Sequence, residues 1–270
     1  MEKSHLQLLR EWFAGFAGSF QSPDGEEQRN IALKEEHTQK VCANITRIAR
    51  EEGLDGDRAA LAEAVALFHD VGRFPQYRRY KTFKDSASVN HAQLGAGILV
   101  VGGVLDKLPR NEQITIITGV RNHNAFAIPP GLEPDVALFL KLVRDADKLD
   151  IWRVFLEFYG LPEEERASAV SLGFPDQPGC SPEVLSALRR GEIVQLASVR
   201  SLNDFKLLQL SWVNDLNFAA SFRMIDERDY INRLAGTLPD DEDIQRAIAV
   251  VKEYVSCRTG PGTGGTRQTA

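Results

Sequence analysis

Four of the five histidines of this chain fall in one stretch, together with two aspartates that belong to the same pattern. In sequence order the six residues are His37, His69, Asp70, His91, His123 and Asp147. Imidazole nitrogens and carboxylate oxygens are common ligands of divalent metal ions in proteins. The set is therefore a candidate site for one or two divalent ions (Mn, Mg, Fe, Ni or Co), and such ions can activate water for hydrolysis.

The apolar neighbours of these residues predict that each of them lies on the buried face of a helix. Val41 follows His37 by four residues, and Val65 precedes His69 by four. Residues three, four or seven apart share one face of a helix. The same spacing surrounds His91, His123 and Asp147. Five separate helices are therefore expected to direct an imidazole or a carboxylate towards the core.

A single histidine on an apolar face is ordinarily a core residue that binds a backbone carbonyl, and this alternative applies to each of the four. Burial of a polar group without a partner costs free energy. Burial of six such groups is tolerable if they converge on metal ions, because the ions neutralise the carboxylates and satisfy the ring nitrogens. His5 lies outside the pattern, near the N-terminus, and is expected to be solvated.

Helical periodicity dominates the whole chain and predicts an all-α fold. Expected helices cover residues 5–20, 27–52, 57–70, 88–104, 110–122, 134–158, 181–190, 204–219, 221–235 and 240–256. Asp24-Gly25 is expected to start the second of them, and the residues between 160 and 180 are expected to be irregular. We predict a single domain over residues 1–257, with a core at about 30–155 and additional C-terminal helices at about 181–256. The Gly- and Thr-rich residues 258–270 are predicted to be a disordered tail.

Composition limits the classes of function. With 43% hydrophobic and 26% charged residues, the chain is typical of a soluble globular protein, and its net charge of -6 gives no reason to expect binding to a nucleic-acid polymer or a membrane. The three cysteines form no CxxC pair, which argues against a zinc knuckle. The N-terminal residues lack the order of a signal peptide, and no apolar run has transmembrane length. The cytoplasm is therefore the expected location.

A basic and aromatic segment, VGRFPQYRRYKTFKD, follows His69-Asp70 directly and is predicted to be a loop. Its first four cations, Arg73, Arg78, Arg79 and Lys81, are candidate substrate-binding residues. Guanidinium groups match phosphate geometry, and aromatic rings can stack on a base or a sugar. The alternative is a solvated loop with its aromatic rings tucked underneath.

A second charged segment, RDADKLD, surrounds Asp147. Lys148 follows this aspartate directly and could reach a bound anion. Asp145 and Asp150 are interpreted as surface or supporting groups, because they are taken to be out of phase with Asp147.

Four motifs, HTQKV at His37, FHDVGRF at His69-Asp70, SVNHAQLGAGIL at His91 and RDADKLD at Asp147, resemble those of the HD-domain superfamily of metal-dependent phosphohydrolases. The resemblance covers roughly residues 30–155. It implies an all-helical core with one or two divalent metals, and usually hydrolysis of a phosphate ester. In that mechanism the nucleophile is a metal-bound hydroxide.

The resemblance also implies roles for single residues. His37, His69, Asp70 and Asp147 would hold a first metal, and Asp70 would bridge to a second metal held by His91 and His123. Asp70 and Lys148 would be the catalytic residues, with Lys148 holding a phosphate oxygen or protonating the leaving group. The six-ligand set is similar to that of two-metal members such as the HD-GYP phosphodiesterases. However, NAFAIPPG after His123 lacks the second histidine and the GYP motif, which argues against cyclic di-GMP as the substrate.

Three functions therefore remain open. The first is hydrolysis of a phosphorylated small molecule, such as a nucleotide. The second is a mixed-valent di-iron oxygenase on the same scaffold, and the third is a non-catalytic, metal-binding signalling or scaffold protein. An apolar stripe in the C-terminal helices, Phe205, Leu208, Trp212 and Leu216, is either core or the face of a partner or homodimer.

Overall fold

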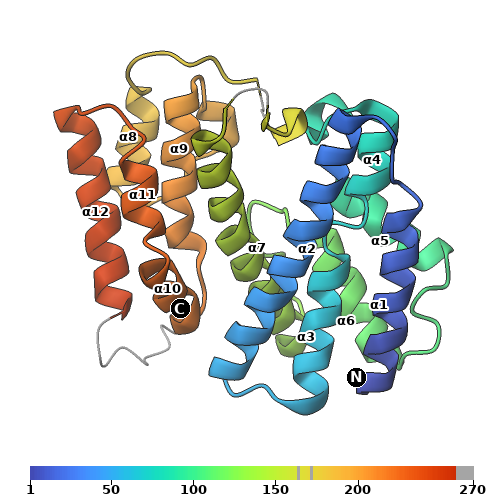
Figure 1. Ribbon diagram of the computed structural model, residues 1–270. Helices are drawn as coiled ribbons and strands as arrows, with labels where there is room; N and C mark the ends of the chain where they lie inside the picture. The colour runs from blue at the N-terminus through green and yellow to red at the C-terminus, as the bar shows by residue number, and fades with distance from the viewer. Residues whose placement is uncertain (163–164, 171–172, 260–270) are drawn as a thin grey trace. The chain divides into compact units, whose positions relative to one another are not determined.

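The computed structural model describes residues 1–162, 165–170 and 173–259, and the regular secondary structure in these ranges is helical (Figure 1). This confirms the predicted all-α class. The chain divides into two compact units, residues 1–172 and 173–270. The expected single domain over residues 1–257 stays a prediction. Within the described ranges, no helix combines the length and the hydropathy needed to cross a membrane.

The first unit is built from seven α-helices and two described 3₁₀ turns. The helices are α1 (Lys3–Gly18), α2 (Gly25–Glu51), α3 (Gly56–Phe68), α4 (Arg73–Tyr80), α5 (His91–Val101), α6 (Arg110–Asn122) and α7 (Pro134–Gly160), with the turns η1 (Asp85–Ala87) and η3 (Ser168–Val170). Asp24 begins α2 as predicted, because its side chain accepts a hydrogen bond from the Glu27 backbone N–H at 2.8 Å.

Helix α3 is the centre of the first unit, and it contacts α1, α2, α6 and α7 (Figure 1). Nearly every residue from Ala60 to Phe68 is buried, which fits a helix that is apolar on all sides. Small residues allow close packing at the crossing of α3 and α6. A methyl group on Gly119 would lie 2.5 Å from Val65 Cγ1, so only glycine fits there. This close packing fixes the ends of α3 and α6, which carry two of the candidate ligands.

The second unit contains α8 (Pro182–Arg189), α9 (Leu202–Ser211), α10 (Ala219–Glu227), α11 (Tyr230–Ala235) and α12 (Glu242–Thr259), with the 3₁₀ turns η4 (Leu196–Ser198) and η5 (Trp212–Asp215). The predicted helix 204–219 is wrong in its second half, where the chain tightens into η5. The predicted helix 221–235 is two helices, because Asp229 adopts a left-handed conformation with φ 52° between them.

Two further predictions concern the C-terminal part of the chain, the apolar stripe and the disordered tail. In the predicted apolar stripe, Phe205, Leu208 and Leu216 are buried and Trp212 is half-buried, which favours its interpretation as core. Of the predicted tail, residues 258 and 259 belong to α12, and residues 260–270 lie outside the described part of the chain.

The predicted loop after His69-Asp70 is also wrong, because residues 73–80 form α4. Phe74, Tyr77 and the following Phe83 are buried, so the aromatic rings anchor this segment in the core. The helix ends at Lys81, which has a left-handed conformation with φ 54°.

Candidate metal centre

Two of the four clustered histidines are oriented by carboxylates. His37, in the middle of α2, donates from Nδ1 to Asp150 Oδ2 of α7 at 2.7 Å. His91, the first residue of α5, donates from Nδ1 to Asp85 of η1 at 2.8 Å. A carboxylate only accepts hydrogen bonds, so we assign the proton to Nδ1 in both rings. Their Nε2 atoms are thereby left as potential ligands.

The other two histidines are oriented by backbone carbonyls. His69 and His123 directly follow the last residues of α3 and α6. At a helix end the last carbonyl groups lack helical partners. His69 Nδ1 donates to the Ala66 carbonyl at 2.6 Å, and His123 Nδ1 donates to the Val120 carbonyl at 2.8 Å. The two helix ends thus fix the orientation of these rings, with the proton on Nδ1.

The four Nε2 atoms meet in two pairs. Those of His37 and His69 lie 3.2 Å apart, and those of His91 and His123 lie 3.0 Å apart. Since Nδ1 is the donor in each neutral ring, each pair brings two lone pairs together. This arrangement is unfavourable unless a cation or a further proton lies between the nitrogens.

Asp70 connects the two pairs of histidines. Its Oδ2 lies 3.6 Å from His37 Nε2 and 3.8 Å from His69 Nε2. Its Oδ1 lies 3.2 Å from His91 Nε2 and 3.7 Å from His123 Nε2. One carboxylate therefore presents a different oxygen to each histidine pair, and two triads that could hold a metal share this residue.

Asp147 on α7 faces only the first pair. Its Oδ1 lies 3.1 Å from His37 Nε2 and 3.7 Å from His69 Nε2. All six residues named from the sequence are thus brought together. Three ligand groups plus a shared carboxylate on one side, and two plus the same carboxylate on the other, fit a pair of divalent ions.

The electrostatics of the centre match this interpretation. Burial and the charge of Lys34 oppose protonation of His37, but hydrogen bonds with Asp147 and Asp150 raise the pKa of His37 to about 9. Burial lowers the pKa of His69 to about 4. The ring of His37 therefore carries the extra proton of the first pair, in the position where a metal ion would replace it.

Both cluster carboxylates are ionised in spite of burial. The pKa of Asp70 is well below its usual value, because Lys34 and the surrounding histidines outweigh the effect of burial. The pKa of Asp147 is lowered by its hydrogen bond with His37 and by the charges of the neighbouring histidines, again against burial. The centre thus offers two anionic groups to a cation.

Two cations lie directly against Asp70. Lys34 Nζ donates to Asp70 Oδ2 at 2.7 Å, and Arg73 Nε lies 3.5 Å from Asp70 Oδ1. The two cationic side chains are each 15% exposed and Asp147 is 14% exposed, whereas the four histidine side chains are at most 3% exposed. Solvent therefore reaches the centre along Lys34, Arg73 and Asp147.

The substrate-binding residues named from the sequence have different surroundings. Arg73 points towards the centre, where its Nη1 donates to Asp85 Oδ1 at 2.9 Å. Arg78 donates to the Ser19 carbonyl at 2.6 Å, and Arg79 lies over the ring of its own neighbour Tyr80. Lys81 pairs with Glu27. Lys148 Nζ donates to the Arg144 carbonyl of its own helix at 3.4 Å. Arg73 is thus linked to the ligand cluster, whereas the contacts of Arg78, Arg79 and Lys81 lie elsewhere.

Asp145 and Asp150 are interpreted from the sequence as surface or supporting groups, and because both are buried the surface alternative is wrong. Asp150 is the supporting group of His37. Sequence reasoning also missed Lys34, Asp85 and Gln76, the last of which donates from Nε2 to Asp85 Oδ1 at 2.9 Å. Lys34 and Asp150 each lie three residues from a named ligand, so helical spacing could have found them.

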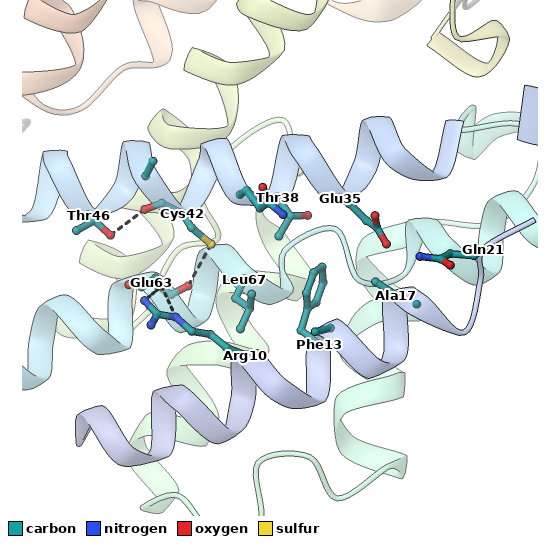
Figure 2. A pocket seen from close by; sticks show the side chains of 14 residues that line it. Arg10, Phe13, Ala17, Gln21, Glu35, Thr38, Cys42, Thr46, Glu63 and Leu67 are labelled. Carbon is teal, nitrogen blue, oxygen red and sulfur yellow. Dashed lines mark hydrogen bonds and ion pairs between the residues drawn. The ribbon is translucent and has the colours of Figure 1, made fainter. Parts of the chain in front are cut away.

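A separate hollow of about 660 Å³ lies between α1, α2 and α3 and includes none of the six clustered residues (Figure 2). Cys42 points into it with its Sγ near the Glu63 carbonyl, and Arg10 pairs with the Glu63 carboxylate. Burial raises the pKa of the Cys42 thiol, which keeps it protonated and a poor nucleophile. The hollow therefore lacks the chemistry of the metal centre.

Comparison with known families matches residues 35–152 to the HD domain. The matched segment begins two residues before His37 and ends five residues after Asp147, so it contains all six clustered residues. No curated protein and no solved structure matches the chain.

Proposed function

We propose that the protein is a metal-dependent phosphohydrolase that cleaves a phosphate ester, because residues 35–152 match the HD domain. The proposed substrate is a nucleotide or a similar phosphorylated metabolite. The proposal combines the family, most of whose members are hydrolases of this type, with the local chemistry of the cluster.

The observation that carries the proposal is the position of Asp70. Each of its two oxygens faces one pair of histidine Nε2 atoms at 3.2–3.8 Å. A carboxylate shared in this way is the usual bridge of a two-metal hydrolytic site. Divalent ions bound there would lower the pKa of a coordinated water and so supply the nucleophile near neutral pH.

The residues around the cluster would orient the histidine ligands and bind the substrate phosphate. Asp85 holds the ring of His91, and Asp150 holds the ring of His37, with the proton on Nδ1, so that Nε2 can bind a metal ion. Arg73 lies at the solvent-accessible side, where a guanidinium can bind the substrate phosphate. Lys148 as the acid for the leaving group remains part of the proposal, since a modest rotation of a lysine side chain can redirect its ammonium.

The test is metal content and phosphatase activity of protein purified without chelators, beside His91→Ala and Asp70→Ala variants. We expect about two ions per chain in the wild type, about one in His91→Ala, and loss of metal and activity together in Asp70→Ala. Full metal load and turnover in Asp70→Ala would show that the site is assigned incorrectly.

The same measurement separates the other two functions. Two irons with oxygen-dependent turnover would replace the hydrolase by a di-iron oxygenase. Bound metal with neither phosphatase activity nor oxygen-dependent turnover would leave the non-catalytic, metal-binding signalling or scaffold protein.

A further inference from the structure

Lys34 occupies an unusual place in the metal centre. It lies on α2, three residues before His37, and its Nζ is 2.7 Å from Asp70 Oδ2. That oxygen is the one that faces His37 and His69. The ammonium group is therefore bound to the carboxylate oxygen that the first metal ion would use.

An ammonium and a divalent ion repel each other when they share one carboxylate oxygen. Metal binding at the first triad would therefore weaken the ion pair between Lys34 and Asp70. A lysine side chain is a flexible four-carbon stem with a compact charge, so its ammonium can turn away without movement of the helix. Lys34 is consequently a cation that metal binding makes available to another anion.

The surroundings of Lys34 indicate where that anion would bind. Its Nζ lies 5.1 Å from the centroid of the Phe83 ring, and the Arg73 guanidinium carbon lies 5.8 Å from the same centroid. Two cations therefore flank one aromatic ring on the side of the centre that solvent reaches. Arg73 is held in place there by Asp85 and Gln76. A tetrahedral oxyanion that bridges two cations beside metal ions is the arrangement typical of phosphate recognition.

We propose that Lys34 is a phosphate-binding residue, which exchanges its ion pair with Asp70 for the substrate phosphate when a divalent ion takes the carboxylate. The inference rests on the proposed function, because it assigns a residue to the phosphate of that substrate. It differs from a role as a simple counter-ion of Asp70 in one respect, which is that Lys34 favours phosphate binding.

The experiment measures both effects on the full chain. The variants are Lys34→Met, which removes the charge at similar length, and Lys34→Arg, which keeps it. Lys40→Met is the matched control, since Lys40 is an exposed lysine on the same helix. Mn²⁺ alone is titrated by calorimetry into each metal-free protein, and inorganic phosphate is then titrated into each Mn²⁺-loaded protein.

We expect Lys34→Met to bind Mn²⁺ at least as tightly as the wild type and to bind phosphate about tenfold or more weakly, as for the loss of one charged hydrogen bond. Lys34→Arg should retain most of the phosphate affinity, and Lys40→Met should match the wild type in both titrations. Weaker Mn²⁺ binding with unchanged phosphate affinity in Lys34→Met would overturn the proposal and leave a structural counter-ion. If Lys34→Met is not folded by circular dichroism, Lys34→Gln replaces it with the same two criteria. Absence of Mn²⁺ binding in the wild type would instead contradict the proposed function itself.

Discussion

The hydrogen bond between His37 and Asp150 allows a quantitative test of the metal centre. Asp150 is fixed by Arg153, whose Nε donates to Oδ1 at 2.7 Å and whose Nη2 donates to Oδ2 at 3.0 Å. The oxygen that receives Nη2 also accepts the proton of His37 Nδ1 at 2.7 Å. We expect Asp150→Asn to keep the size of the side chain and one oxygen that can accept from His37 Nδ1 and Arg153 Nη2. Its amide NH₂ cannot accept from Arg153 Nε, and the negative charge that makes the His37 ring a strong ligand is removed.

The expected loss is about 10- to 100-fold in metal affinity, as is typical for an outer carboxylate that supports a metal-bound histidine. This corresponds to about 1.4–2.7 kcal/mol. At metal concentrations that saturate both proteins, the stabilisation provided by the metal falls by the same amount. For a unit of this size the melting temperature of the metal-loaded variant should fall by about 3–11 °C relative to the loaded wild type.

The assay is competition with a metal-binding dye, combined with thermal unfolding at matched metal concentrations. Glu36→Gln is the control, because Glu36 is half exposed, contacts Arg153 at 3.2 Å and does not touch a histidine. We expect it to change the metal affinity by less than about twofold, as for other exposed ion pairs. Equal metal affinity in Asp150→Asn and the wild type would refute the reasoning that this carboxylate orients and strengthens the His37 ligand.

Three further predictions follow from single contacts. A metal ion needs the neutral ring of His37, whose pKa is about 9. Metal binding between pH 7 and 8 should therefore release about one proton, and the metal affinity should rise about tenfold per pH unit. Calorimetry in buffers of different ionisation enthalpy measures the number of protons released, and a value of zero would contradict this prediction. Gly72→Ala should cost about 2–3 kcal/mol in urea unfolding, because its new Cβ would lie 2.1 Å from the His91 carbonyl oxygen, whereas Gly97→Ala, with nothing within 4 Å, should not destabilise the protein. Arg78→Ala should leave kcat and KM of the phosphatase within about twofold, because its contacts are with the end of α1; a large rise in KM would return it to the substrate site.

The six candidate ligands could be named from the sequence because each lies within a helix or within two residues of its end. Helical spacing ties such a residue to its apolar neighbours, so burial can be predicted from local sequence alone. His69 and His123 show that the prediction of burial remains correct when a helix end is misplaced by one or two residues. They follow α3 and α6 rather than belonging to them, yet their helical backbone conformations keep them on the same face.

The groups that support the ligands were harder to predict, for two different reasons. Asp150 lies three residues after Asp147 and so shares a face with it, which means that the phase argument against it was applied incorrectly. Asp145 is buried although it lies on another face, because α7 has buried residues on more than one of its faces. Asp85 is different: it belongs to a 3₁₀ turn, and no periodicity relates it to His91.

The residues of α4 were predicted to be a loop, and they include Pro75. Proline is compatible with the first turn of a helix, where its missing N–H has no helical partner in any case. Pro75 is the third residue of α4, within that first turn. The helix is then stabilised by the burial of Phe74 and Tyr77. This contribution comes from tertiary packing and cannot be predicted from the local sequence.

The placement of the cations illustrates what a charge-rich segment can and cannot indicate. The residues after Asp70 were named as candidates for substrate binding because many of them are cationic. The position of each cation is decided by a partner distant in sequence. Arg78 binds the end of α1 and Lys81 binds Glu27, 59 and 54 residues away. Lys34 belongs to no basic cluster, yet it forms the shortest described contact of a cation with Asp70. An isolated lysine one helical turn from a buried ligand is therefore a stronger indicator of a cation at the ligand cluster than a run of exposed cations, because burial beside a carboxylate has to be compensated and exposure to water does not.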